Sequence, residues 1–125
     1  MKRERNPVGW FELYVSDMPR AKAFYETVFQ TILDQLPAPD VEMWAFPHEP
    51  ERPGCAGALA KMEGKDPGNG GTIIYFSCED CASEESRVNA AGGSVHLPKT
   101  SIGEYGFISL VLDSEGNMIG LHSMT

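Results

Sequence analysis

Residues 9–29 read GWFELYVSDMPRAKAFYETVF, and the pattern returns at residues 72–92, which read TIIYFSCEDCASEESRVNAAG. In each copy an apolar strand leads to an aspartate and then to an amphipathic helix, and Asp17 of the first copy aligns with Asp80 of the second. A repeat of roughly half of a 125-residue chain is typical of two copies of one small module rather than of a solenoid. We expect the copies to face each other and a ligand to bind in the groove between them.

The two modules are placed at residues 7–63 and 71–125, joined by a link at residues 64–70 that is rich in turn formers. Each module is expected to contain one helix and four strands in the order β-α-β-β-β, because alternating apolar residues mark strands and a 3.6-residue period marks the helix. In the first module the elements are expected at Val8–Val15, Met18–Gln30, Thr31–Leu36, Val41–Phe46 and Cys55–Met62. In the second they are expected at Thr72–Cys78, Asp80–Ala91, Ser94–Pro98, Tyr105–Leu112 and Asn117–Ser123. The predicted fold class is therefore α+β.

Charge and hydropathy limit the binding partners and the cellular location that we expect for this protein. The formal net charge of −8 opposes binding to a polyanion, so nucleic acid is not an expected partner. The start, MKRERNP, is basic like a signal peptide, but the strand after it alternates with polar residues and forms no apolar run. No stretch is long enough to span a membrane either. We therefore expect a cytoplasmic protein without a membrane partner.

Three cysteines form an odd set, which argues against a disulfide framework. Cys78 and Cys81 have the C-x-x-C spacing at a strand–helix junction, where a helix N-terminus can activate a thiol for redox chemistry or metal binding. Against this, Cys78 falls on the strand face that should meet the helix, and Glu79 and Asp80 disfavour a thiolate. A buried small residue followed by a helix-start residue is the preferred interpretation, and the role of the pair stays open.

Three stretches carry a family resemblance: WFELYVSDMPRAKAFYETVF, AAGGSV and YGFISLVLDSEGNMIGL. In this order they resemble the glyoxalase, bleomycin-resistance and extradiol-dioxygenase superfamily, also called the vicinal oxygen chelate proteins, and in particular its uncharacterised members related to lactoylglutathione lyase. The resemblance implies that the paired modules form a curved mixed sheet with the helices on its convex side. It also implies a ligand cleft on the concave face, and a homodimer is common.

The resemblance also implies where a metal ion would sit. Metal-using members hold a divalent ion with about four His or Glu side chains, contributed by the first and last strands of each module. The matching positions here are Trp10, Ile73, Gly120 and one residue among 57–59, none of which carries a suitable donor. We therefore expect no metal cofactor. The alternative is a divalent ion held at a displaced site, two residues along each strand, by Glu12 and His122.

Glu12 is the strongest candidate for chemistry because it lies between Trp10 and Tyr14 on the face expected to line the cleft. A carboxylate there is costly unless it is hydrogen-bonded or faces a wet cleft. It could act as a general base beside a carbonyl group, or it could be a structural anchor bonded to a backbone amide or to Tyr75.

The remaining ligand-binding candidates are aromatic or apolar residues expected to line the same cleft, together with one histidine. They are Trp10, Tyr14, Trp44, Phe46, Ile73, Tyr75 and His122. An aromatic cleft in an acidic protein suits a flat apolar or cationic molecule, although the same residues could simply fill the cleft or a dimer interface. Two functions follow as hypotheses. One is a metal-independent protein that binds a small organic ligand. The other is an isomerase or lyase that acts on a small oxygenated metabolite, with Glu12 as base or displaced metal ligand.

Overall fold

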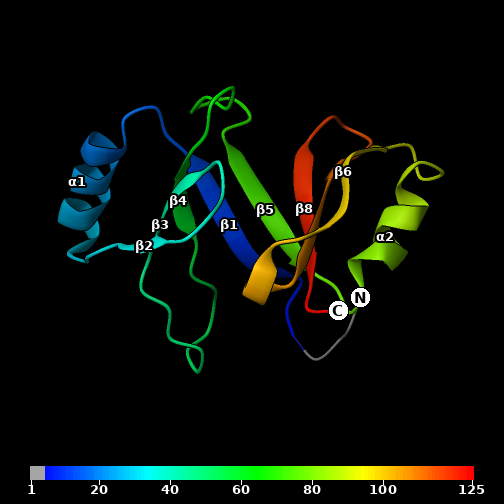
Figure 1. The fold of residues 1–125 in the computed structure, drawn as a ribbon, viewed down its shortest axis with the longest axis horizontal. Helices are drawn as coiled ribbons and strands as arrows, with labels where there is room; N and C mark the ends of the chain where they lie inside the picture. Colours follow the sequence, from blue (N-terminus) through cyan, green and yellow to red (C-terminus); the bar gives the residue numbers. More distant parts are fainter. Residues whose placement is uncertain (1–4) are drawn as a thin grey trace. The chain divides into compact units, whose positions relative to one another are not determined.

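The computed structural model describes residues 5–125, and the first four residues of the basic start considered above as a signal peptide lie outside this range. The chain divides into two compact units. We call Trp10–Thr72 the α1 unit, and Ile73–Thr125 together with the described residues up to Gly9 the α2 unit. Each unit is described by itself, and Figure 1 labels most of their helices and strands.

The α1 unit contains the helix α1 (Met18–Phe29) and a mixed arrangement of four strands in the order β2-β3-β4-β1. The strands are β1 (Val8–Tyr14), β2 (Asp34–Leu36), β3 (Glu42–Ala45) and β4 (Ala58–Lys61). Strand β1 runs parallel to β4, whereas β3 is antiparallel to both β2 and β4. This is the β-α-β-β-β order expected for the first module.

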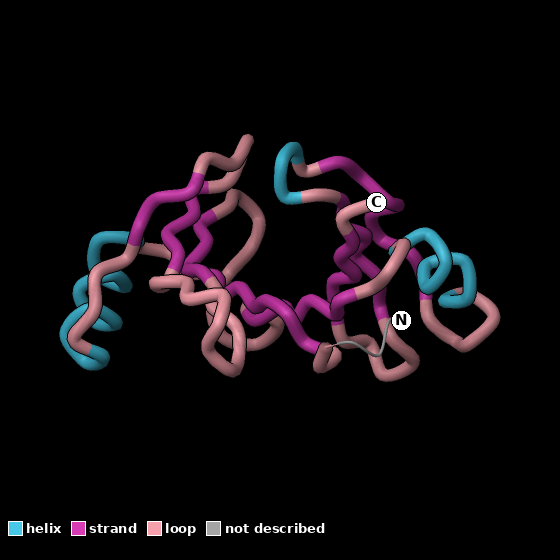
Figure 2. Tube along the Cα trace, turned by 90° about the horizontal axis from the view of Figure 1, so that it is seen from below, coloured by secondary structure: helices cyan, strands magenta, loops and turns pink. Residues whose placement is uncertain are grey.

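The α2 unit repeats this plan with the strand order β5-β8-β7-β6. Its elements are β5 (Thr72–Ser77), α2 (Cys81–Val88), β6 (Ser94–Ser101), the short 3-10 helix η1 (Gly103–Tyr105), β7 (Phe107–Leu112) and β8 (Met118–Ser123). Strand β5 is parallel to β8, and β7 is antiparallel to both of its neighbours. Figure 2 shows a helix beside the strands of each unit, and the predicted α+β class with a mixed sheet is confirmed.

Both helices begin where the aspartates of the repeat predicted. The Asp17 carboxylate accepts a hydrogen bond from the Arg20 amide at 3.0 Å, and the Asp80 carboxylate accepts one from the Ala82 amide at 3.0 Å. Each bond satisfies one backbone donor that the first helical turn leaves unpaired. Helix α1 ends at Phe29, because Gln30 adopts a left-handed conformation with φ of 51°.

Most element boundaries differ from the sequence expectation by one to three residues, and β2, β4, α2 and β6 differ most. Helix α2 ends at Val88 rather than at Ala91, because residues 89–93 turn back and the Gly93 amide bonds the Val88 carbonyl at 3.0 Å. Strand β6 continues past Pro98 to Ser101. It lies at the end of its strand order, where a proline without an amide hydrogen is tolerated.

Each unit packs its helix against a core of its own. In the α1 unit this core is built on Met18, Leu33 and Leu59, with Leu13 and Val15 packed against it. The helix-facing side of β1 was therefore predicted correctly.

In the α2 unit the core is built on Cys81, Val111 and Leu121. Phe76 and Cys78 of the strand that leads into α2 pack against it, so Cys78 faces the helix as expected. No helix within residues 5–125 is long and apolar enough to cross a membrane.

Candidate functional site

Glu12 lies on the face of β1 that is turned away from α1. It pairs with Ala58 of β4, and Tyr14 pairs with Ala60, so these four residues share one face of the α1 unit. The exposed fraction is 7% for Glu12, 8% for Tyr14 and zero for both alanines. The carboxylate is thus held in a strongly dehydrated place, beside two small apolar side chains.

The Tyr14 hydroxyl orients the Glu12 carboxylate. It donates a hydrogen bond to Glu12 Oε1 at 3.1 Å, from two residues further along the same strand. Burial raises the pKa of Tyr14 well above its ordinary value of 10.0, and the negative charge and hydrogen bond of Glu12 add to the shift. Tyr14 therefore stays protonated at any physiological pH and acts as a permanent donor to the carboxylate. The i, i+2 spacing on one strand was the sequence signal that could have named this partner.

This arrangement has a defined chemical capacity. A carboxylate can accept hydrogen bonds from a ligand, and a buried one is able to act as a general base. Trp10, on the same strand face and only partly buried, could contribute an aromatic surface next to Glu12. The structure thus brings three of the predicted site residues onto one strand face: Trp10, Glu12 and Tyr14.

The matching strand pair of the α2 unit carries different side chains. Tyr75 of β5 pairs with Gly120 of β8, as Glu12 pairs with Ala58 in the α1 unit. A Cβ atom built at residue 120 would overlap the Tyr75 ring. The ring therefore occupies the space of a side chain at 120, the position where the resemblance placed a glutamate ligand of metal-using relatives. Ile73 and Tyr75 are both buried, with exposed fractions of 1% and 6%.

His122 lies on the Tyr75 face of the α2 unit, where it pairs with Ser77. Its Nε2 atom is 2.6 Å from the carbonyl oxygen of Tyr105. Because a carbonyl oxygen only accepts hydrogen bonds, this nitrogen carries the proton and donates it. The contact ties β8 to η1 and leaves Nδ1 as the nitrogen that could serve a ligand.

The donor set was tested for a divalent metal ion. Within either unit, no three His, Cys, Asp or Glu side chains among residues 5–125 lie close enough together to hold one. The displaced candidates fall in different units, Glu12 on β1 and His122 on β8. The residues of neither unit alone fit a metal site.

Two predicted cleft residues lie on the opposite face of the α1 unit. Trp44 pairs with Leu59, a core residue beneath α1, and its ring lies under Lys22 Nζ, 3.4 Å from the ring centroid. Phe46 packs edge-on against Tyr25 of α1, with ring centroids 5.8 Å apart. The prediction that both share a face with Glu12 was wrong. Alternation indicates that two residues share a face, but it does not say which face of a short strand meets the helix.

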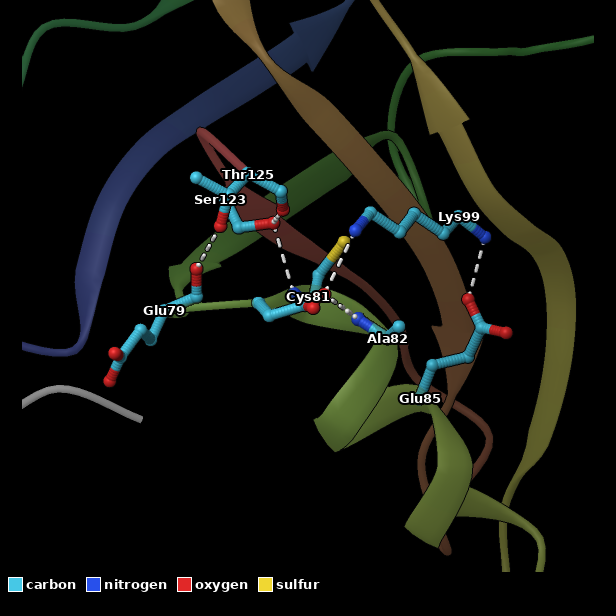
Figure 3. Close-up of polar contacts among 8 residues, drawn as sticks. Glu79, Cys81, Ala82, Glu85, Lys99, Ser123 and Thr125 are labelled. Carbon is cyan, nitrogen blue, oxygen red and sulfur yellow. Dashed lines mark hydrogen bonds and ion pairs between the residues drawn. The ribbon is translucent and has the colours of Figure 1, made fainter.

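The C-x-x-C pair belongs to the core of the α2 unit. Cys81 is fully buried, and burial raises the pKa of the Cys78 thiol to about 11, with a further contribution from the charge of Glu84. The Cys78 thiol is therefore protonated near neutral pH, which disfavours nucleophilic or redox chemistry. The Cys81 amide donates a hydrogen bond to Ser123 Oγ at 3.0 Å, and this bond anchors the start of α2. Figure 3 shows the contact.

Comparisons with known proteins agree with this architecture. The model of the Glyoxalase/Bleomycin resistance protein/Dioxygenase superfamily matches residues 8–121. No curated protein matches the sequence.

Several solved structures share the fold at low sequence identity. Methylmalonyl-CoA epimerase from Mycobacterium tuberculosis is 13% identical, with 95% of this chain and 88% of that chain covered and a TM-score of 0.65. A Streptomyces coelicolor methylmalonyl-CoA epimerase variant in complex with 2-nitronate-propionyl-CoA is 14% identical, with 94% and 96% covered and a TM-score of 0.66. An uncharacterised protein from Methanosarcina mazei is 15% identical, with 96% and 95% covered and a TM-score of 0.62.

The structural likenesses establish the fold, and the family model spans nearly the whole chain, including both strand–aspartate–helix repeats. The protein therefore belongs to the glyoxalase/bleomycin resistance protein/dioxygenase superfamily.

Proposed function

We propose that this protein binds a small organic ligand at the Trp10–Tyr14 face of β1 and does so without a divalent metal ion. The observation that carries the proposal is the Glu12 carboxylate, which lies buried on this strand face and accepts a hydrogen bond from the Tyr14 hydroxyl. A buried carboxylate costs stability unless it is paired or serves a site. The low exposure of this face implies that a ligand reaches Glu12 only by displacing neighbouring side chains.

The class of ligand follows from charge. Solved structures with this fold include methylmalonyl-CoA epimerases, one of them in complex with methylmalonyl-CoA, but identities near 13% carry the fold and not the substrate. A protein of net charge −8 with a carboxylate at its site repels highly anionic molecules such as CoA esters. We therefore propose an uncharged or cationic molecule that offers a hydrogen-bond donor to Glu12 and an apolar surface to Trp10.

Metal independence is supported by the residues that stand at the ligand positions of metal-using relatives. Trp10, Ile73 and Gly120 offer no donor side chain, and the Tyr75 ring fills the space above Gly120. Elemental analysis of untagged protein grown with Ni, Zn, Mn and Fe supplied should find far less than one metal per chain after dialysis. Near-stoichiometric metal that is lost on Glu12→Ala or His122→Ala would overturn this part of the proposal.

A second candidate function is an isomerase or lyase related to lactoylglutathione lyase, with Glu12 as general base. The dehydrated setting of Glu12 favours it, since removing a proton beside a carbonyl needs a carboxylate held close to the substrate and shielded from water. Tyr14 would then be a positioning residue that holds the carboxylate without itself giving up its proton.

Glu12→Gln separates the two functions, because it removes the charge and the basicity but keeps the shape. We expect binding of an uncharged ligand to change by less than about threefold, whereas an enzyme would lose its turnover. Glu42→Gln is the matched control, since Glu42 is an exposed carboxylate of the same unit on β3. Loss of binding in Glu12→Gln, with Glu42→Gln unchanged, would instead show that the ligand is a cation held by the charge.

The resemblance also predicts a homodimer. This prediction is tested together with the pocket described next.

A further inference from the structure

Helix α1 covers its strands incompletely and leaves an open apolar pocket of about 460 Å³. Residues of β1, α1 and the segments that follow α1 and β3 line it: Phe11, Leu13, Tyr25, Phe29, Thr31 and Phe46. The pocket is open to solvent on one side and lies beside the core of the α1 unit. The pocket is a feature that the Glu12 site does not use.

The walls of the pocket are aromatic. Tyr25 and Phe29 stack nearly parallel, with ring centroids 6.1 Å apart and an interplanar angle of 10°. On the strand side, Phe11 and Phe46 lie with ring centroids 6.1 Å apart. A Cβ atom at Gly57 would overlap the Phe11 ring, so this ring is seated directly on the backbone of residue 57. The strand wall is thus fixed in place.

The pocket and Glu12 lie on opposite faces of β1. Phe11 and Leu13 alternate with Glu12 along the strand, and Leu13 packs into the α1 core. A molecule in the pocket would therefore touch neither Glu12 nor Tyr14. The inference drawn from this pocket is independent of the function proposed for the Glu12 face.

We propose that the pocket binds a flat, uncharged aromatic molecule of two or three rings. Aromatic walls favour a ligand that stacks on them or meets them edge-on, and the six lining residues include no charged side chain to hold an ion. The lining is almost entirely apolar, so contact with the rings is what would hold the molecule.

The volume favours a small molecule over a protein segment. An apolar cavity of about 150 Å³ holds one benzene molecule, and ligand pockets range from about 300 to 1,000 Å³. A docked helix, about 10 Å across, needs a groove several residues longer than one lined by Phe11, Leu13 and four neighbours.

The test uses N-phenyl-1-naphthylamine, an uncharged three-ring probe whose fluorescence rises in apolar surroundings. Phe29→Ala removes one wall, and Thr31→Trp fills the opening. Phe24→Ala is the matched control, because Phe24 lies on the same helix and is 58% exposed, against 63% for Phe29, but does not line the pocket. Urea unfolding of each variant confirms that it is folded, and Thr31→Ser controls for the change at 31.

We expect a saturable component of probe binding that is weakened about fivefold by Phe29→Ala and at least tenfold by Thr31→Trp. Phe24→Ala, Thr31→Ser and Glu12→Gln should leave it unchanged. Equal losses in Phe24→Ala and Phe29→Ala would overturn the proposal, because they would indicate a general apolar surface. Sedimentation equilibrium supplies another contradicting outcome: a dimer that Phe29→Ala dissociates would make a second copy of the chain the occupant.

Discussion

The two units contain the same parallel strand pair but carry different side chains at its equivalent positions. In the α1 unit Glu12 of β1 lies opposite Ala58 of β4, and in the α2 unit Tyr75 of β5 lies opposite Gly120 of β8. The parallel register is the same in both, yet one unit presents a carboxylate and the other fills the matching space with a ring. The repeat thus fixes the backbone, while single side chains decide which unit can carry chemistry.

The two helices also differ in the contacts that they make with the rest of their units. Helix α2 is held by polar bonds from the Cys81 amide to Ser123 and from the Lys99 amide to Glu85, both shown in Figure 3. Lys99 Nζ also donates to Asp80 at 2.9 Å. Helix α1 instead leaves three large apolar side chains of its second half exposed: Phe24, Val28 and Phe29. One helix is closed by specific bonds, and the other borders an open apolar pocket.

The largest effect is expected from Gly120→Ala, which places a methyl group inside the Tyr75 ring. Urea unfolding should show a loss of about 2 to 3 kcal/mol in the free energy of unfolding. The same change in a Tyr75→Leu background should cost clearly less, because the ring is gone. A loss below about 0.5 kcal/mol would show that the ring does not fill this space.

The second largest effect is expected from Tyr14→Phe, which should lower the free energy of unfolding by about 2 kcal/mol. The buried carboxylate of Glu12 loses a hydrogen-bond donor, while the volume of the ring is kept. Chemical denaturation measures it, and Tyr25→Phe is the control in the same unit. If the two variants are equally stable, the Tyr14–Glu12 bond contributes nothing and the account of the site fails.

Sequence reasoning reached much of this architecture. The repeated aspartates located both helix starts, and the alternation in β1 put Leu13 and Val15 beneath α1. It failed for Trp44 and Phe46, because the face of a short strand is set by its partner strand, here through Leu59.

The sequence patterns also did not predict contacts between residues that are distant in the chain. No local pattern signals that the Tyr75 ring lies over Gly120, or that Tyr25 of α1 meets Phe46. The pocket beside α1 depends on how far the helix stands from its strands, which the amphipathic period does not encode.

Ser123→Ala should cost about 1 kcal/mol, because the buried Cys81 amide loses its acceptor at the start of α2. Thermal or urea unfolding measures the loss, and Ser86→Ala, an exposed serine on α2, is the control. An unchanged midpoint would mean that α2 does not depend on its polar anchor.

The smallest expected effect is on the stability of the protein at low pH, and it concerns Asp80. The hydrogen bond from Lys99, followed by that from the Ala82 amide, lowers the pKa of Asp80 below its ordinary value of 3.8. The unfolded chain then binds the proton more readily, so this contribution is present above that value and is lost as the pH falls through the lower pKa of the folded state.

Melting temperatures from about pH 5 to about pH 2 should therefore fall less steeply in Asp80→Asn than in the wild type. Asp17→Asn, which changes the equivalent cap of α1, is the comparison. A slope in Asp80→Asn as steep as in the wild type would contradict the role of the Lys99 contact.

The proposal of metal-free ligand binding at Glu12 is tested most directly by amide chemical-shift mapping. Protein dialysed against EDTA is titrated with uncharged and cationic aromatic compounds, with methylmalonyl-CoA included as an anionic comparison. The account predicts that an uncharged or cationic compound shifts the amides of residues 10–14 and 58–60, with no change on adding metal. Binding that appears only after a divalent metal ion is added, and is lost in Glu12→Ala, would contradict it.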